Sequence, residues 1–89
     1  MIYKVKSGFI VRKIGSQIMA VPVGQQTTAL HGMIALSESG ALLWKALQTG
    51  ADEQQLCSLL LENYEVSSET ALADTKKFLQ GLREQGALE

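Results

Sequence analysis

Every strand-like segment of this chain precedes every helix-like segment, and this order constrains the fold more than any other feature of the sequence. Residues 9–14 and 17–21 are rich in β-branched side chains, and the two residues Gly15-Ser16 between them are typical of a tight hairpin turn. Pro22, which has no N–H to donate, should end the second strand. A third strand is expected over residues 32–36. Strands followed by helices predict an α+β fold with a three-stranded antiparallel sheet in the order 1-2-3.

Capping signals divide the rest of the chain into helices. Ser37 and Gly50 suit the start and the end of a first helix over residues 38–48. Asp52, with Gln55 three residues later, forms a capping-box pattern that predicts the start of a second helix. The apolar face of this second helix would carry Leu56, Leu59, Leu60 and Tyr64.

A third helix is expected to start after Ser67 or Ser68 and to end at Gly86. Leu88 could then fold back on its last turn. The helix would bury one stripe made of Leu72, Thr75, Leu79 and Leu82, with Phe78 alongside. We expect a single domain over residues 1–89, because a chain of this length cannot enclose two cores.

The composition is that of a globular protein, with 46% hydrophobic and 19% charged residues. No apolar run approaches the roughly 18 residues that a transmembrane helix needs. The N-terminal sequence MIYKVKSGF lacks the apolar block and cleavage site of a signal peptide. We therefore expect a cytoplasmic protein with no membrane partner, and the single cysteine, Cys57, suits that reducing compartment.

The small net charge of −1 hides an asymmetry between the two halves of the chain. Residues 1–37 carry Lys4, Lys6, Arg12 and Lys13 and no acidic residue. The remaining residues carry four basic residues and all nine acidic ones. The helical half is therefore acidic, which is unfavourable for a surface that binds nucleic acid.

No set of residues fits catalysis or metal binding. His31 is the only histidine, so neither a histidine-based triad nor a histidine metal site can form, and a lone histidine before Gly32 is typical of a turn. Cys57 has no cation in its own helical turns to activate it, and beside Leu56 it is typical of a small buried side chain. The glycines follow no phosphate-loop pattern. We therefore expect no enzyme activity, no catalytic residue, no metal and no cofactor.

Two binding functions remain, and the first is that of a winged-helix DNA-binding regulator. Its recognition helix should direct several basic or amide side chains at one groove of the DNA. The third helix offers Lys76, Lys77, Gln80 and Arg83, but Glu69, Asp74 and Glu84 lie among them. The charge pattern therefore disfavours nucleic acid as a partner.

The second function is capture of a peptide at an edge of the sheet. In the order 1-2-3 the first and third strands are the edges, and Arg12 and Lys13 guard the first against stray pairing. The third strand has no charge and no proline, so another chain could add a strand there. Two alternatives are that the protein's own helices cover this edge, or that a second copy pairs with it in a homodimer.

The segment LHGMIALSESGALLW, residues 30–44, resembles the pattern L-N-G-x-I-x-L-N-x-T-G-A-x-(I/L)-W of PqqD-like proteins. Residues 50–56 (GADEQQL) and 74–79 (DTKKFL) resemble the next blocks of that family in the same order, and the likeness covers about residues 8–89. PqqD-like proteins are recognition elements for ribosomally made, modified peptides (RiPPs). They have a small winged helix-turn-helix-like fold of three strands and then three helices.

The resemblance implies a non-catalytic peptide chaperone. Such a protein binds the leader segment of a precursor peptide and presents the core to a modifying enzyme, often a radical SAM enzyme. In the family the leader adds as a fourth strand on the third strand, in the groove against the third helix. Carried onto this chain, the leader-binding site consists of Met33, Ile34, Ala35, Leu36, Ala71, Asp74, Thr75 and Phe78.

The chain departs from the family pattern at three positions. Asn is common where His31 and Ser37 stand, and Ser37 remains a good helix cap. Thr75 replaces an aliphatic residue, so its hydroxyl should lie in the groove or have a partner inside the protein. Some family members are fused to their enzyme, whereas this chain is expected to be free-standing. Its basic first half would help to attract an acidic leader, an effect that salt would screen.

Overall fold

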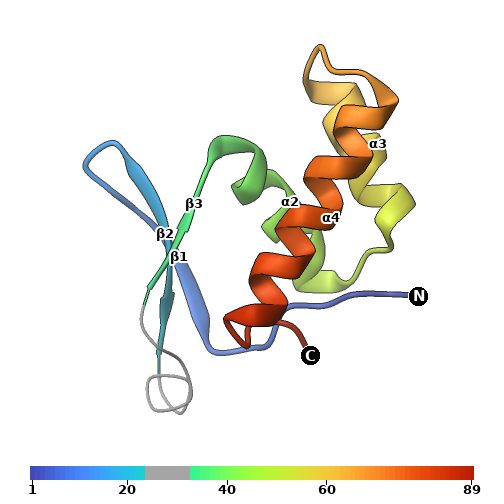
Figure 1. Ribbon diagram of the computed structural model, residues 1–89. Coiled ribbons are helices and arrows are strands. Elements are labelled where there is room, and N and C mark those ends of the chain that lie inside the picture. Colours follow the sequence, from blue (N-terminus) through green and yellow to red (C-terminus); the bar gives the residue numbers. More distant parts are fainter. Residues whose placement is uncertain (24–32) are drawn as a thin grey trace.

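Three antiparallel strands precede three helices in the computed structural model, which describes residues 1–23 and 33–89. The elements are β1 (Phe9–Ile14), β2 (Gln17–Pro22), β3 (Ile34–Leu36), α2 (Glu38–Thr49), α3 (Glu53–Asn63) and α4 (Ser68–Glu84). The helices all lie on one side of the sheet (Figure 1). This arrangement confirms the predicted α+β fold.

The sheet has the predicted strand order β1-β2-β3. Ile14 pairs with Gln17, so the hairpin turn consists of Gly15 and Ser16, and Gly15 has a φ of 63° that favours glycine. β3 pairs with β2 over three residues only. The predicted strand over 32–36 is thus too long, because Met33 lies outside the strand. Gly32 and His31, with the turn predicted for them, lie outside the described residues.

Side chains cap the three helices as the sequence predicts. The Oγ of Ser37 accepts a hydrogen bond from the N–H of Gly40 at 3.0 Å, and α2 runs one residue past the predicted end, to Thr49. At the start of α3 the two bonds of a capping box join Asp52 and Gln55 at 2.7 and 2.9 Å. Ser67, not Ser68, caps α4.

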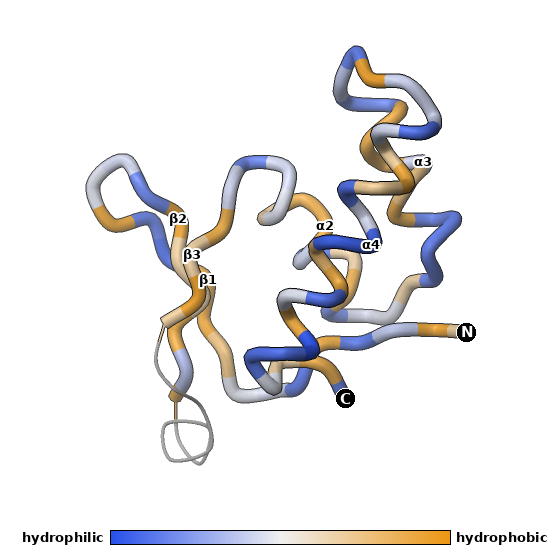
Figure 2. The backbone as a smooth tube through the Cα atoms, viewed as in Figure 1, coloured by the Kyte–Doolittle hydropathy of each residue, from blue (hydrophilic) through white to orange (hydrophobic). Residues whose placement is uncertain are grey.

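The hydrophobic core lies between the inner face of the sheet and the helices. Figure 2 shows α3 and α4 alternating between hydrophobic and hydrophilic along their length, as expected of helices with one buried face. Phe9 of β1 packs edge-to-face on Trp44 of α2, with ring centroids 5.2 Å apart, and so joins sheet to helix. The core also contains Ala20, Ile34 and Leu36 from the sheet and Leu43, Leu47, Leu56, Leu60, Leu79 and Leu82 from the helices.

Two of the predicted apolar faces need correction. The buried stripe of α4 starts at Ala71 and includes Thr75, whereas Leu72 is 41% exposed. On α3, Leu56 and Leu60 are buried and Leu59 packs against the core. Tyr64 comes after the last helical residue and is 37% exposed. Cys57 is half-buried, and not fully buried as predicted.

The first residues, for which the sequence analysis predicts no element, pair with two later segments. Tyr3 exchanges backbone hydrogen bonds with Ala51 at 2.8 and 2.9 Å, and Val5 forms an isolated bridge with Leu88. Val5 is only 5% exposed and belongs to the core. Leu88 was predicted to fold back on the last turn of α4, but in the structure it pairs with Val5 of the N-terminal segment and packs against the core.

Candidate functional site

The free edge of β3 presents the backbone of one residue, Ala35. Hydrogen-bonded and non-hydrogen-bonded pairs alternate along an antiparallel ladder. The N–H of Val23 donates to the C=O of Gly8 at 2.8 Å, so Gly8 and Val23 form a hydrogen-bonded pair. Every second pair from there along the register is also hydrogen-bonded, and Arg12 with Met19 is one of these pairs. The pair of Met19 with Ala35 is then non-hydrogen-bonded. The N–H and C=O of Ala35 therefore point away from β2.

The side chains around Ala35 fix this edge in place. Ile34 is 4% exposed and Leu36 is 7% exposed, so both anchor the strand in the core. Ala35 and Met33 are exposed. Among the described residues, no strand pairs with this edge of β3. Its two backbone groups thus stand on a rigid strand without a charge, as the sequence predicts for this segment.

A groove continues from the end of β3 between the start of α2 and α4. Its first part is an open hollow of about 370 Å³, lined by Ser37, Ser39, Gly40, Leu43, Leu60, Asp74, Lys77 and Phe78. A second hollow shares four of these residues and extends the groove to Glu38, Tyr64 and Val66. An extended segment paired with β3 could therefore place side chains in the groove.

Gly40 allows Phe78 to form one wall of this groove. A Cβ on Gly40 would stand 3.2 Å from Cε1 of Phe78 and 3.2 Å from the Oγ of Ser37, closer than side chains usually approach. Phe78 is half-buried against the core, so one part of its ring is held and another faces the groove. The missing side chain at position 40 thus sets the position of an aromatic wall.

The four predicted residues of α4 separate into two pairs. Asp74 and Phe78 line the groove, where residues that bind a leader are expected to lie. Ala71 and Thr75 are fully buried behind it. The Sγ of Cys57 donates to the hydroxyl of Thr75 at 3.6 Å, which supplies the internal partner that this hydroxyl needs. Ala71 and Thr75 therefore support the wall from inside, and the role of all four in binding stays a prediction.

Six residues that line the first hollow were not predicted as site residues: Ser37, Ser39, Gly40, Leu43, Leu60 and Lys77. A signal for two of them existed. Gly40 and Leu43 lie three residues apart, on one face of the helix that Ser37 starts, and Gly40 belongs to the segment that carries the family resemblance. Leu60 and Lys77 come from two other helices, and only the packing of α3 on α4 brings them to the same hollow.

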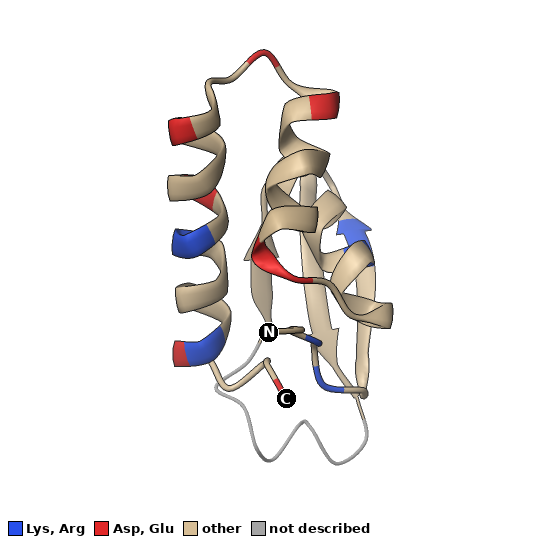
Figure 3. Ribbon diagram, turned by 90° about the vertical axis from the view of Figure 1, so that its right-hand side faces the viewer, with Lys and Arg blue, Asp and Glu red and all other residues tan. Residues whose placement is uncertain are grey.

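The charges around the groove do not favour one sign. Glu38, Asp74 and Lys77 contribute them, so the basic residues of the first half of the chain do not line it. Figure 3 shows both acidic and basic residues along α4. An acidic leader would thus gain little attraction from this groove, and the half-buried ring of Phe78 is its main accessible apolar surface.

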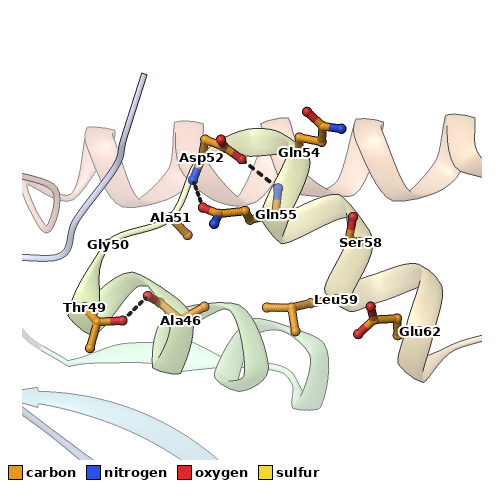
Figure 4. Close-up of a pocket in the computed structure, with 10 residues that line it drawn as sticks. All are labelled: Ala46, Thr49, Gly50, Ala51, Asp52, Gln54, Gln55, Ser58, Leu59 and Glu62. Carbon is orange, nitrogen blue, oxygen red and sulfur yellow. Dashed lines mark hydrogen bonds between the residues drawn. The ribbon is translucent and has the colours of Figure 1, made fainter.

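A larger hollow lies between the end of α2 and α3 (Figure 4). Asp52 and Gln55 bond to each other there, and the hydroxyl of Thr49 donates to the C=O of Ala46 at 3.2 Å. These polar groups already serve the helix ends. In the described ranges no three metal-binding side chains gather, and no helix is both long and apolar enough to cross a membrane.

Comparisons with known proteins agree with this geometry. The model of the family "Coenzyme PQQ synthesis protein D (PqqD)" matches residues 21–88. Two similar solved structures are "TbiB1 in Complex with the TbiA(beta) Leader Peptide" and "Lasso peptide synthetase B1 complexed with the leader peptide". The first shares 20% identity over 97% of this chain and 94% of that chain, with a TM-score of 0.75. The second shares 18% identity over 98% and 96%, also with a TM-score of 0.75. No curated protein sequence matches the chain.

Proposed function

The chain belongs to the PqqD family, and from this premise we propose that it binds the leader segment of a ribosomally made precursor peptide and presents the precursor to a modifying enzyme. The protein itself acts as a chaperone in the cytoplasm and performs no chemistry. The modifying enzyme is a radical SAM enzyme. Both similar structures were solved with leader peptides bound, which supports the same class of ligand here.

One observation carries the proposal: the N–H and C=O of Ala35 point to a free, charge-free edge next to a groove with an aromatic wall. A strand that adds to this edge gains backbone hydrogen bonds, and every second side chain of that strand points to the groove side of the sheet. Because β3 has three residues, the backbone contributes few hydrogen bonds. Recognition of the leader should therefore depend on side chains that enter the groove and contact Phe78.

The test is a titration followed by NMR, with synthetic peptides that cover the leader segments encoded beside the gene. The amide of Ala35 should shift most, together with the amides of Ile34 and Leu36 and the ring protons of Phe78. A shift confined to β1 would place the ligand at the other edge and contradict the proposal. A homodimer through β3 would compete for the same groups, so added leader should dissociate it into monomers.

DNA binding receives no support from the structure. Exposed Lys76, Lys77 and Arg83 of α4 are interspersed with exposed Asp74 and Glu84, which would repel phosphates. A gel-shift series with duplex DNA at increasing salt provides the check. We expect no band shift at the lowest salt concentration.

Replacement of Gly40 with Ala should weaken leader binding by about three- to tenfold, or roughly 0.7–1.4 kcal/mol. The new methyl group would push the ring of Phe78 into the groove, since the two would otherwise stand 3.2 Å apart. The free energy of unfolding should change by less than about 1 kcal/mol, because alanine is the better helix former. Calorimetric titration and thermal unfolding measure the two quantities.

Gly81→Ala is the matched control, because a Cβ at Gly81 of α4 would meet nothing within 4 Å. It should stabilise the protein by about 0.5–1 kcal/mol and leave leader affinity unchanged. If both alanine variants bind the leader like the wild type, Phe78 does not form a wall of the binding site.

A further inference from the structure

The two faces of the sheet have different surroundings. Ala20, Ile34 and Leu36 point to the inner face, where they are buried under the helices. Because side chains alternate along a strand and paired residues share a face, Met19 and Ala35 point to the opposite, outer face. None of the three helices lies on that side (Figure 1). The outer face is thus open among the described residues.

This outer face is mainly apolar. The register places in successive rows Ile10 with Val21, then Arg12 with Met19 and Ala35, then Ile14 with Gln17. Ile10 is 41% exposed and Ile14 is 53% exposed. We call Ile10, Arg12, Ile14, Met19, Val21 and Ala35 the outer-face patch. Globular proteins rarely leave a contiguous apolar patch in water unless a partner covers it.

We propose that the outer-face patch is the docking surface for the modifying enzyme, and that the enzyme recognises the protein with its leader bound. This inference rests on the proposed function. The partner surface it requires is apolar and carries a carboxylate that can pair with the guanidinium of Arg12. The patch lies on the opposite side of the sheet from the groove that receives the other leader side chains.

The charge of the patch favours an enzyme over a second copy of the chain. Arg12 is its only charged residue, and the described strands carry no acidic residue at all. If two patches packed on each other, each Arg12 would be buried against a surface without a carboxylate. An unpaired buried charge is strongly unfavourable. A different protein can supply the missing carboxylate.

Continuity with the β3 edge couples the patch to the leader. A strand added beside Ala35 extends the row of Arg12, Met19 and Ala35 by one residue. Every second side chain of the leader then points outward, next to the patch. An enzyme on the outer face would contact protein and leader at once. Bound leader should therefore increase the affinity between this protein and the enzyme.

The experiment measures binding of the enzyme encoded beside the gene, by calorimetry or interferometry, with and without saturating leader peptide. The main variant is Ile10→Thr/Val21→Thr, which removes apolar surface from one row but keeps β-branched side chains. The second variant, Arg12→Glu, reverses an exposed charge and does not depend on packing. Leu61→Gln is the control, because Leu61 of α3 is 42% exposed and lies away from the sheet.

We expect both patch variants to bind the leader like the wild type and to bind the enzyme at least about tenfold more weakly, as loss of a central apolar contact does. Leu61→Gln should match the wild type in both assays. Wild-type affinity for the enzyme in both patch variants would overturn the inference while leaving leader binding intact. A second result would also overturn the inference: the wild type forms a dimer, and the threonine variant dissociates this dimer but binds the enzyme like the wild type. If the wild type binds no leader, the proposed function itself fails.

Discussion

Proline in place of Ala35 should lower the affinity for the leader peptide by at least about 30-fold, or roughly 2 kcal/mol. The N–H of Ala35 faces the free edge, so the substitution removes a hydrogen bond worth about 0.5–1.5 kcal/mol. The proline ring also occupies the space that the added strand would approach. The hydrogen bonds between β2 and β3 survive because they involve Ile34 and Leu36. Calorimetric titration measures the loss, and circular dichroism verifies the fold.

Val11→Pro is the control for this result. Val11 pairs with Ala20 next to the hydrogen-bonded pair of Arg12 and Met19. Because the two kinds of pair alternate, Val11 and Ala20 are a non-hydrogen-bonded pair, and the N–H of Val11 faces the free edge of β1. This variant should bind the leader within about twofold of the wild type. Unchanged affinity in a folded Ala35→Pro variant would exclude strand addition at β3. Equal losses in both variants would show that proline acts through the sheet as a whole.

Local signals account for the parts of the fold that the sequence predicts well. The turn at Gly15 and Ser16 depends on two residues, and the capping box depends on the spacing of Asp52 and Gln55. Each forms through contacts between near neighbours in the chain, so a single segment contains the information. The edge character of β3 is similar, because its lack of charge is visible in the residues themselves.

The phase of α4 could not be predicted in the same way. Leu72 is larger and more apolar than Ala71, so a stripe drawn by hydrophobicity passes through Leu72. In the structure, close packing of α4 on α3 buries the small Ala71 and the polar Thr75, whose hydroxyl accepts from Cys57. Only the contact with α3 determines that Ala71, and not Leu72, is buried. It also decides that Asp74 and Phe78 face the groove.

The sequence of the N-terminal segment contains only a weak signal for its strand-like pairing. Tyr3, Lys4, Val5 and Lys6 alternate apolar and charged side chains, which is typical of a half-buried strand. Four residues are too few to predict a partner. The partners are Ala51, between α2 and α3, and Leu88, near the C-terminus, and their positions depend on the complete fold.

Leu79→Ala should destabilise the protein by about 2–5 kcal/mol, a large part of the roughly 5–15 kcal/mol that holds a domain folded. Leu79 is 4% exposed in the stripe of α4 that faces the core, and its removal leaves a cavity that the neighbouring helices cannot fill. Urea unfolding followed by circular dichroism gives the free energy of unfolding. Alanine has good helix propensity, so the loss reports packing and not helix formation.

Leu72→Ala is the matched control, with the same chemical change in the same helix, about two turns before Leu79. Leu72 is 41% exposed, and its replacement should cost less than about 1 kcal/mol. Leu72 and Leu79 lie within about 20° of each other around the helix, so equal costs would mean that the start of α4 is packed as tightly as its later turns. Because Asp74 of the groove lies two residues after Leu72, this pair of variants tests the packing of the part of α4 that forms the groove wall, by a measurement that needs no ligand.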